Sequence, residues 1–404
     1  TELFPSFSFI YSNAPPCNGQ FPEVRFNPPF TMAYDCYCAI CGVSFSGMHI
    51  ESPSETAIER RRRWIEKRCR ALEAGQDITQ IPTEESDAPV RSYDPRLVDT
   101  DNISWLYKAY CLGSNPPPSG TSKTNKAFIS GPGYYADIGE LVVKPGNDQY
   151  QPSARKTFMC YDEGTEDAAG PVLPFHWSCF EILTRVLTGS TEINNVNLNA
   201  LYSVMSALTN HSSLHLSYGD DILRSQGRYW ECIPGAEYCA KNPTDTPMVD
   251  ELFQNLSTDS KFKRPSLEIE LRERRPTDPF GQLPLEIAQQ ICMFLPGDSL
   301  KALAQASLSV QMITQDNSFW KRFMQWDMPW LWEFQTLQTQ KDVNYKSLYL
   351  WLNKMTTPRY GMDDLNLMGV ANRRRVWGVC EQLASRYNNS TGQTPAAAMK
   401  WGRD

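Results

Sequence analysis

The chain has 404 residues, of which 41% are hydrophobic, and its formal net charge is −7. At about 150 residues per domain, this length predicts two or three units with packed cores, which excludes a wholly disordered chain. The acidic balance argues against nucleic acid as the main partner, and no apolar run approaches the ~20 residues that would span a membrane.

The first helix is expected over residues 55–74, ETAIERRRRWIEKRCRALEA, after a Pro-, Phe- and Asn-rich stretch at 1–30 that predicts an extended arm. The apolar residues of this helix recur on a single stripe, at Ile58, Ile65, Cys69 and Leu72. Glutamates interleave with Arg60–Arg63 at helical spacing, which indicates a solvated helix face rather than a nucleic-acid patch.

Two loops and a short helix are expected next. Residues 75–98 and 112–127 are polar and rich in Pro, Ser and Gly, so both stretches predict loops. Between them, DNISWLYKAY (101–110) predicts a helix that Asp101 or Asn102 caps.

The middle of the chain changes from a strand pattern to a helical one. Over residues 128–161, glycine turns separate short aromatic and β-branched runs, which predicts the strands of a small sheet. HWSCFEILTRVL (176–187) and NNVNLNALYSVMSAL (194–208) each predict a helix. Residues 213–248 have no clear period and are expected to be irregular.

The last third of the chain is expected to be entirely helical. Helices are predicted in five stretches, at 283–295, 298–307, 318–334, 345–355 and 372–387. The fold class is therefore mainly α with a small β-sheet. Its expected parts are an α+β N-terminal domain (1–262), a charged linker (263–277), an all-α module (278–325) and a helical C-terminal extension (326–404).

A metal half-site stands near the N-terminus, in CYCAICG (36–42). Cys38 and Cys41 are two residues apart, so their thiolates can hold one zinc ion from a tight turn. Gly42 directly after the second thiol accepts the left-handed backbone that such a turn often needs. Unrelated buried thiols and thioredoxin-like redox chemistry are the alternatives, although GVSFSG does not open a helix as the redox motif requires.

His176 and Cys179 form a second half-site, because side chains at i and i+3 project from the same face of a helical turn. The two half-sites together would complete a closed tetrahedral site for one structural zinc, with the ligands Cys38, Cys41, His176 and Cys179. The 134 residues between Cys41 and His176 do not forbid this, since loop-closure entropy grows only logarithmically. Cys36 is a possible substitute ligand, and packing beside the site is the simpler interpretation for it.

No catalytic site is expected. His211 and His215 lie four residues apart without the glutamate that a metalloprotease needs between them, and GPG (131–133) is a turn rather than a phosphate loop. Neither a Ser/His/Asp arrangement nor a pair of carboxylates stands out. Arg373–Arg375 is interpreted, like the earlier arginine run, as a solvated helix face.

Residues 278–323 contain a series of features that resembles an F-box, a helical module of roughly 45 residues that recruits a Skp-type adaptor. Leu283-Pro284 opens a helix, Asp298-Ser-Leu300 begins a second helix, and Phe319-Trp320 closes the motif. The resemblance implies adaptor binding by nine residues: Leu283, Pro284, Ile287, Ile291, Leu295, Leu300, Leu303, Val310 and Trp320.

The residues themselves indicate an exposed apolar ridge. Leu283, Ile287, Ile291 and Leu295 recur four residues apart, and Pro284 occupies a first-turn position where proline is tolerated. Three short helices cannot bury such ridges among themselves, so the surplus apolar face must meet another domain or another protein. A three-helix core packed wholly within this chain is the alternative.

The order CxxCG, GPGYY, PFHWSC, F-box and NRRRVW looks like a family of fungal F-box proteins. This resemblance implies a non-enzymatic substrate receptor of an SCF-type, cullin-RING ubiquitin ligase. The Skp-type adaptor would link it to the cullin-RING scaffold, an unknown protein would be its substrate, and its location would be intracellular, in cytoplasm, nucleus or both. The alternative is a zinc-stabilised protein- or nucleic-acid-binding protein outside such a ligase.

Overall fold

The structure of the protein is a computed structural model that describes most of the chain between Asp35 and Gly392. The described ranges are 35–51, 54–76, 91–115, 126–136, 139–143, 156–162, 170–256, 258–264, 278–335, 337, 340 and 342–392. All of them belong to one compact unit. The arm predicted at 1–30 and most of the linker predicted at 263–277 lie outside the described residues.

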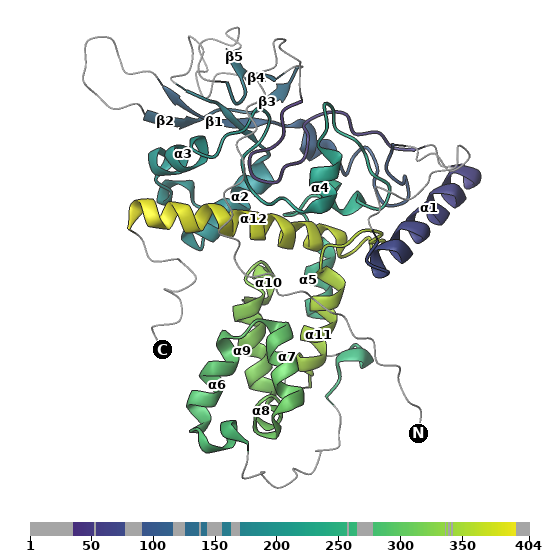
Figure 1. Ribbon diagram of the computed structural model, residues 1–404, viewed down its shortest axis with the longest axis vertical. Coiled ribbons are helices and arrows are strands. Elements are labelled where there is room, and N and C mark those ends of the chain that lie inside the picture. Colours follow the sequence, from purple (N-terminus) through teal and green to yellow (C-terminus); the bar gives the residue numbers. More distant parts are fainter. Residues whose placement is uncertain are drawn as a thin grey trace. The chain divides into compact units, whose positions relative to one another are not determined.

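Helices predominate among the described elements, and two small antiparallel sheets accompany them (Figure 1). The α-helices are α1 (Glu55–Glu73), α2 (Trp177–Thr188), α3 (Leu198–Ser206), α4 (Asp220–Ser225), α5 (Pro247–Gln254), α6 (Leu285–Phe294), α7 (Gly297–Ala306), α8 (Leu308–Ile313), α9 (Asn317–Asp327), α10 (Trp332–Gln335), α11 (Tyr345–Thr356) and α12 (Met368–Thr391). The strands are β1 (Tyr110–Asn115), β2 (Lys126–Ile129), β3 (Gly133–Tyr135), β4 (Glu140–Val143), β5 (Lys156–Met159) and β6 (Leu173–Phe175). Short 3₁₀ helices are η3 (Ser104–Tyr107), η4 (Ile193–Asn195), η5 (Glu237–Ala240), η6 (Ser260–Phe262) and η7 (Pro279–Gln282). The expected fold class is confirmed, with two sheets where one was expected.

The strands pair as two three-stranded sheets, in the orders β2-β1-β6 and β3-β4-β5. Leu112 of β1 is the partner of Ile129 on one side and of Leu173 on the other. The prediction of a loop over 112–127 is therefore wrong at both ends. The last residues of β1 pair with the first residues of β2. Backbone hydrogen bonds across the hairpin satisfy residues whose side chains alone favour a loop.

The helix predicted at 101–110 is wrong except for one 3₁₀ turn, η3. Neither Asp101 nor Asn102 caps η3, which begins without a side-chain cap. The Asp99 carboxylate instead accepts a hydrogen bond from the backbone N–H of Asn102. Tyr110 already belongs to β1, where it pairs with Phe175. The strand pairing ends the helix, a tertiary effect that local sequence cannot show.

Two other predictions of local structure need correction. Residues 213–248 are not wholly irregular, because they contain α4, η5 and the first residues of α5. The single helix predicted from 318 to 334 is two helices, α9 and α10. Pro329 stands between them, and a proline disfavours helical backbone at the residue before it.

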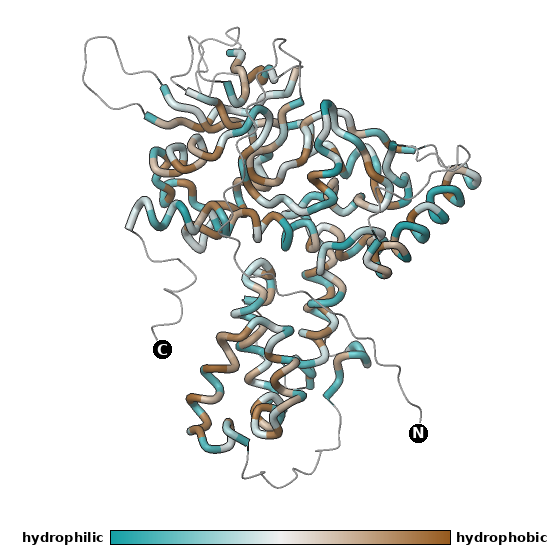
Figure 2. Tube along the Cα trace, in the orientation of Figure 1, coloured by the Kyte–Doolittle hydropathy of each residue, from teal (hydrophilic) through white to brown (hydrophobic). Residues whose placement is uncertain are grey.

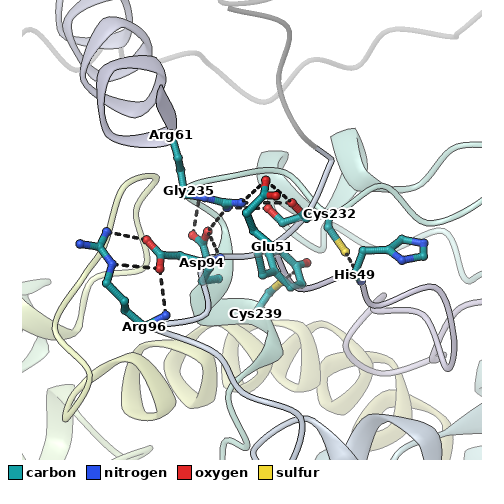
Figure 3. Close-up of polar contacts among 11 residues, drawn as sticks. His49, Glu51, Arg61, Asp94, Arg96, Cys232, Gly235 and Cys239 are labelled. Carbon is teal, nitrogen blue, oxygen red and sulfur yellow. Dashed lines mark hydrogen bonds and ion pairs between the residues drawn. The ribbon is translucent and has the colours of Figure 1, made fainter. Parts of the chain in front are cut away.

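Helix α1 buries a different face from the one its apolar stripe predicted. Ala57, Arg61, Trp64 and Ala71 are its buried residues, whereas Leu72 is exposed. The solvated-face interpretation holds for Arg62, which pairs with Glu59 at 2.7 Å, and is wrong for Arg61. Figure 3 shows Arg61 in a polar network with Glu51. Arg61 pairs with Glu51 and Glu237 and donates hydrogen bonds to Ser92. Two carboxylates provide the partners that a buried guanidinium needs.

Helix α12 packs against α2, α3 and η5, and it also touches α11 (Figure 1). Its arginines are not a solvated face, because Arg373 is 0% exposed and Arg375 is buried. The Arg373 guanidinium donates to both oxygens of Glu333 at 2.8 Å and to the Pro243 carbonyl at 2.7 Å. It also stacks on Trp332, with its central carbon 3.6 Å from the ring centroid. One residue thus joins α12 to α10 and to the segment before α5.

We expect Arg373→Ala to lower the free energy of unfolding by about 3 kcal/mol, because it removes the ion pair that both oxygens of the half-buried Glu333 carboxylate make with the guanidinium. Arg373→Lys should lose most of the same stability, since an ammonium cannot reproduce the planar fork or the stacking. Urea unfolding followed by circular dichroism measures both. Arg386→Ala, on an exposed turn of the same helix, is the matched control. Equal effects at 373 and 386 would contradict this role for Arg373.

Helices α6 to α9 and α11 pack around aromatic side chains. The Trp320 and Phe323 rings each lie 5.2 Å from the ring of Tyr349, which anchors α11 on α9. Figure 2 shows apolar residues along α6, and several of them lie on the surface rather than in this core. None of the described helices is long and apolar enough to cross a membrane.

Candidate functional site

The CYCAICG stretch folds as the tight turn that its sequence predicts. Cys38 donates its backbone N–H to the Val43 carbonyl, and Gly42 donates its own to the Cys38 carbonyl. Gly42 has a φ of +75°, and a side chain there would also collide with the Tyr218 ring. The backbone N–H of Cys41 points to the Cys38 sulfur at 3.4 Å, so the turn already stabilises negative charge on that sulfur.

Helix α2 brings the second pair of ligands to this turn. His176 is its N-cap residue, and Cys179 lies in the first turn. The ligand atoms of Cys38, Cys41, His176 and Cys179 all lie within 4.8 Å of one another, and all four residues are buried. The sequence prediction that these residues meet is confirmed. A buried group of three sulfurs and one imidazole nitrogen could hold a metal ion.

The orientation of His176 suits a metal ligand. Its Nδ1 faces the group, 3.4 Å from the Cys41 sulfur, and its Nε2 lies 3.0 Å from the Leu106 carbonyl oxygen. A carbonyl can only accept, so Nε2 carries the proton and the Nδ1 lone pair stays free for a metal. The Phe45 and Trp105 rings, with centroids 4.4 and 5.0 Å from the imidazole, keep its plane in place.

The three thiols differ in how easily they lose a proton. Burial raises the pKa of Cys41 and of Cys179 well above the usual range. Burial acts the same way on Cys38, but hydrogen bonds from Cys179 and Cys41 and the nearby His176 hold its pKa well below the usual range. The protein alone therefore favours a thiolate at Cys38, and a divalent cation would provide the charge that the other two need.

Arg375 is the contributor to this group that the sequence did not reveal. From α12, 334 positions after Cys41, its guanidinium donates to the Cys41 carbonyl at 2.7 Å and to the Tyr218 carbonyl at 3.2 Å. Its other hydrogen bonds go to the neutral side chain of Asn372. Its positive charge would offset the net negative charge of three thiolates and a divalent cation if the group holds a metal ion. The only signal in the sequence was a run of three arginines.

The remaining candidates lie outside the group. Cys36 is buried but is not a member, and its N–H donates to the Tyr135 hydroxyl, which agrees with packing beside the site. His211 and His215 are exposed. No helix begins at Cys38 or Cys41, which disfavours the thioredoxin-like alternative.

The predicted apolar ridge is exposed along α6. Leu283, Ile287 and Ile291 are large apolar residues at the surface, with Ile287 44% exposed, and Pro284 is exposed as well. Leu295 and Leu303 are half-buried. Leu300, Val310 and Trp320 lie in the core, so these three support the module from inside.

Two exposed residues were missed by the sequence reasoning. Phe294 is 73% exposed and continues the ridge three positions after Ile291, and Leu285 is also exposed. Beside Leu285 is a hollow of about 330 Å³ whose lining includes Leu283, Leu285 and Met312. The i+3 spacing of Phe294 was visible in the sequence, whereas the hollow depends on how α8 packs. We name the exposed set Leu283, Ile287, Ile291 and Phe294 the apolar face.

Comparison with known proteins bears on this helical module. Residues 280–326 match the family model described as F-box-like. The chain contains an F-box-like domain. The match begins and ends close to the module expected at 278–325, and it includes α6, α7, α8 and nearly all of α9. Comparisons with curated proteins and with solved structures gave no match.

Asp278 fastens the start of the F-box-like domain to α8. Its carboxylate accepts hydrogen bonds from the Phe280 N–H at 3.0 Å, the Ser309 N–H at 2.9 Å and the Ser307 hydroxyl at 2.8 Å. The Ser309 backbone bond is the main reason that the pKa of Asp278 falls to about 2. The charged form is thus favoured in the folded state.

A lowered carboxyl pKa stabilises the fold above the usual pKa of about 4, and this stabilisation disappears as the pH falls through the folded pKa. We expect the domain to lose stability between about pH 4 and about pH 2. Because Asp278 is only half-buried, Asp278→Asn should cost about 1 kcal/mol at neutral pH. Asp278→Asn should also remove most of this loss of stability at acid pH, as measured by urea unfolding, whereas Asp298→Asn should not. If Asp278→Asn loses as much stability at acid pH as the unmodified protein, the assignment is wrong.

Proposed function

We propose that the chain is the substrate-recognition subunit of an SCF-type ubiquitin ligase. The F-box-like domain supports adaptor binding, and the single observation that carries the proposal furthest is the apolar face that this domain exposes. Large apolar side chains gathered on one helix, beside a hollow, are typical of a protein-binding surface.

A Skp-type adaptor is the proposed partner of the apolar face. Contact is proposed for the exposed residues Leu283, Pro284, Ile287 and Ile291, with Leu295 and Leu303 at its margin. The buried Leu300, Val310 and Trp320 would act through the shape of the domain. The adaptor would connect the chain to a cullin-RING scaffold, and the proposed location is therefore the cytoplasm, the nucleus or both.

We further propose that the buried group of Cys38, Cys41, His176 and Cys179 holds one structural zinc ion. Three sulfurs and one nitrogen form a ligand set that zinc accepts, and a fully buried group leaves no open position for chemistry. The zinc would tie the turn at 38–41 to α2 and so stabilise the α+β part of the chain, proposed over residues 1–262. This part would bind the target protein, and the chain would perform no catalysis itself.

The test is co-expression of the full chain with a Skp-type adaptor, followed by size-exclusion chromatography. We expect one complex with both proteins in equal amounts. Such a receptor acts by raising the effective concentration of its target near the ubiquitin-loaded enzyme. A chain that stays folded and elutes separately from the adaptor would overturn the proposal. We also propose that the whole chain is similar to fungal F-box proteins.

A further inference from the structure

A hollow of about 440 Å³ lies where the segment 96–105, the segment 241–248 and the start of α12 meet. Its lining includes Lys241 and three aspartates. The apolar part of the lining is Leu97, Trp105, Pro247, Met248 and Leu365. None of these residues belongs to the apolar face or to the metal group. We name this hollow the lysine pocket.

Lys241 is the half-buried cation of this pocket, and it has no carboxylate partner among the described residues. Burial lowers the pKa of its ammonium group, and Asp99 opposes this effect without cancelling it. Asp99 itself accepts hydrogen bonds from the backbone N–H and the side-chain amide of Asn102. A carboxylate that enters the pocket would therefore stabilise the charged form of Lys241.

The first residues of α5 and α12 form part of the wall around Lys241. Neither N-cap residue, Thr246 or Leu367, accepts a hydrogen bond from the first helical turn with its side chain. The first N–H groups of a helix have no intrahelical partner and carry partial positive charge, so both helices add to the attraction for an anion. Gly369 in α12 allows the close approach of this helix, because a Cβ there would lie 3.1 Å from the Asn242 carbonyl oxygen.

The more exposed part of the lining carries the opposite charge. Asp99, Asp101 and Asp245 line the pocket and are exposed. Arg96, the other cation of the lining, is held by the Asp94 carboxylate at 2.7 Å (Figure 3). The pocket thus combines one half-buried ammonium group with three exposed carboxylates. A ligand with an anion at its end and a cation just before that end matches both.

The backbone around Lys241 is held in place before any ligand arrives. The side-chain amide of Asn372 in α12 donates to the Lys241 carbonyl at 2.7 Å, and the Trp105 Nε1 donates to the Ala240 carbonyl at 3.0 Å. The Trp105 ring also packs on the imidazole of His176, with the ring centroids 5.0 Å apart. Groups that are already positioned lose little entropy when a ligand binds.

We propose that the lysine pocket binds the free carboxyl terminus of the target protein, with a lysine or arginine just before that terminus. This inference rests on the proposed function, because it identifies the part of a target that the receptor would recognise. The terminal carboxylate pairs with Lys241, and the basic side chain meets the exposed aspartates. The apolar part of the lining contacts the remaining atoms of the last residues. Chain ends are commonly accessible, and capture of a terminal carboxylate is a recurring mode of peptide recognition.

The test measures fluorescence anisotropy of labelled degenerate peptide pools with arginine fixed at the second-last position. One pool ends in a free carboxylate (the acid pool) and the other in an amide (the amide pool). The full-length protein should bind the acid pool at least about tenfold more tightly, because only a carboxylate forms a charge-assisted bond with Lys241. Alanine in place of the fixed arginine should weaken binding of the acid pool about threefold, since the aspartates that meet the arginine are exposed.

Variants of the protein place the binding in this pocket. Lys241→Met should weaken binding of the acid pool about tenfold and leave the amide pool unchanged, whereas Lys241→Arg should keep the difference between the pools. Lys108→Met is the matched control, because Lys108 is exposed and does not line the pocket. Asp101→Asn combined with Asp245→Asn should remove the preference for arginine over alanine.

Equal affinity for the acid and amide pools would overturn the proposal, as would an equal loss in Lys108→Met. A third pool has an amidated end and glutamate as its last residue. If it binds as tightly as the acid pool, the pocket recognises a side-chain carboxylate and the assignment to a chain terminus is wrong.

Two further measurements keep the outcomes distinct. If Lys241→Met fails to fold by circular dichroism, the double aspartate-to-asparagine variant decides whether the peptides bind in this pocket. Adaptor binding is measured on the same preparations. A protein that binds adaptor but does not distinguish the acid from the amide pool overturns only this inference. The reverse result overturns only the proposed function.

Discussion

Cys41→Ser is expected to release the metal and to unfold the α+β part of the chain. Elemental analysis of the unmodified protein should give one zinc per chain. Binding a structural zinc contributes on the order of 10 kcal/mol, which is comparable with the entire stability of a typical domain. The hydroxyl of serine is a poor ligand for zinc, so this stabilisation should be lost almost completely. Thermal unfolding and metal content, measured together, check the result.

Control variants test whether the loss of zinc is specific to the four proposed ligands. His211→Ala and His215→Ala change exposed residues and should leave the zinc in place, and so should Cys36→Ser. Adaptor binding should persist in Cys41→Ser, because the F-box-like domain is formed by consecutive residues that include none of the four members of the group. A metal-free chain that folds normally would refute the zinc assignment. A disulfide between Cys38 and Cys41 in protein purified without oxidant would also do so.

Replacing Ile287 and Ile291 together by Asp should weaken adaptor binding by about 4 kcal/mol, roughly a thousandfold. Both side chains lie on the apolar face, at 44% and 37% exposure, so the change should leave the core of the domain intact. In the complex, however, each carboxylate would be buried without a partner. The milder pair of changes, Leu283→Ala with Pro284→Ala, should cost about 3 kcal/mol, because it only removes contact area.

Surface plasmon resonance with immobilised adaptor measures both effects. Leu350→Asp is the matched control, since Leu350 is 40% exposed but belongs to α11, outside the F-box-like domain. Its affinity should equal that of the unmodified protein. If the double aspartate variant is folded and binds the adaptor undiminished, the apolar face is not the contact.

The metal group could be predicted from sequence because its signal is local within each half. Two thiols in a turn and a His–Cys pair at a helix start each have a recognisable spacing, and only the pairing of the halves had to be inferred. Arg375 could not be found in this way. Its role depends on α12 packing against α2, a contact between residues that are far apart in the chain.

The arginines show where reasoning from charge fails. Glutamates near Arg60–Arg63 at helical spacing correctly indicated the exposed pair of Arg62 with Glu59. The partners of Arg61 lie at Ser92 and Glu237, so nothing in the local pattern distinguished it from its neighbours. The apolar stripe of α1 failed to predict its buried face for the same reason, because Arg61 is buried on a different face of the helix.

The separation of the two half-sites also constrains how the protein is made. Cys179 leaves the ribosome 138 residues after Cys41 (179 − 41), which corresponds to roughly 7–28 s of synthesis at 5–20 residues per second. During that interval the first two thiols belong to a nascent chain that cannot close the site, so they are open to oxidation or to capture by other metals. We expect faithful metal loading to depend on a reducing environment during translation rather than on the finished fold.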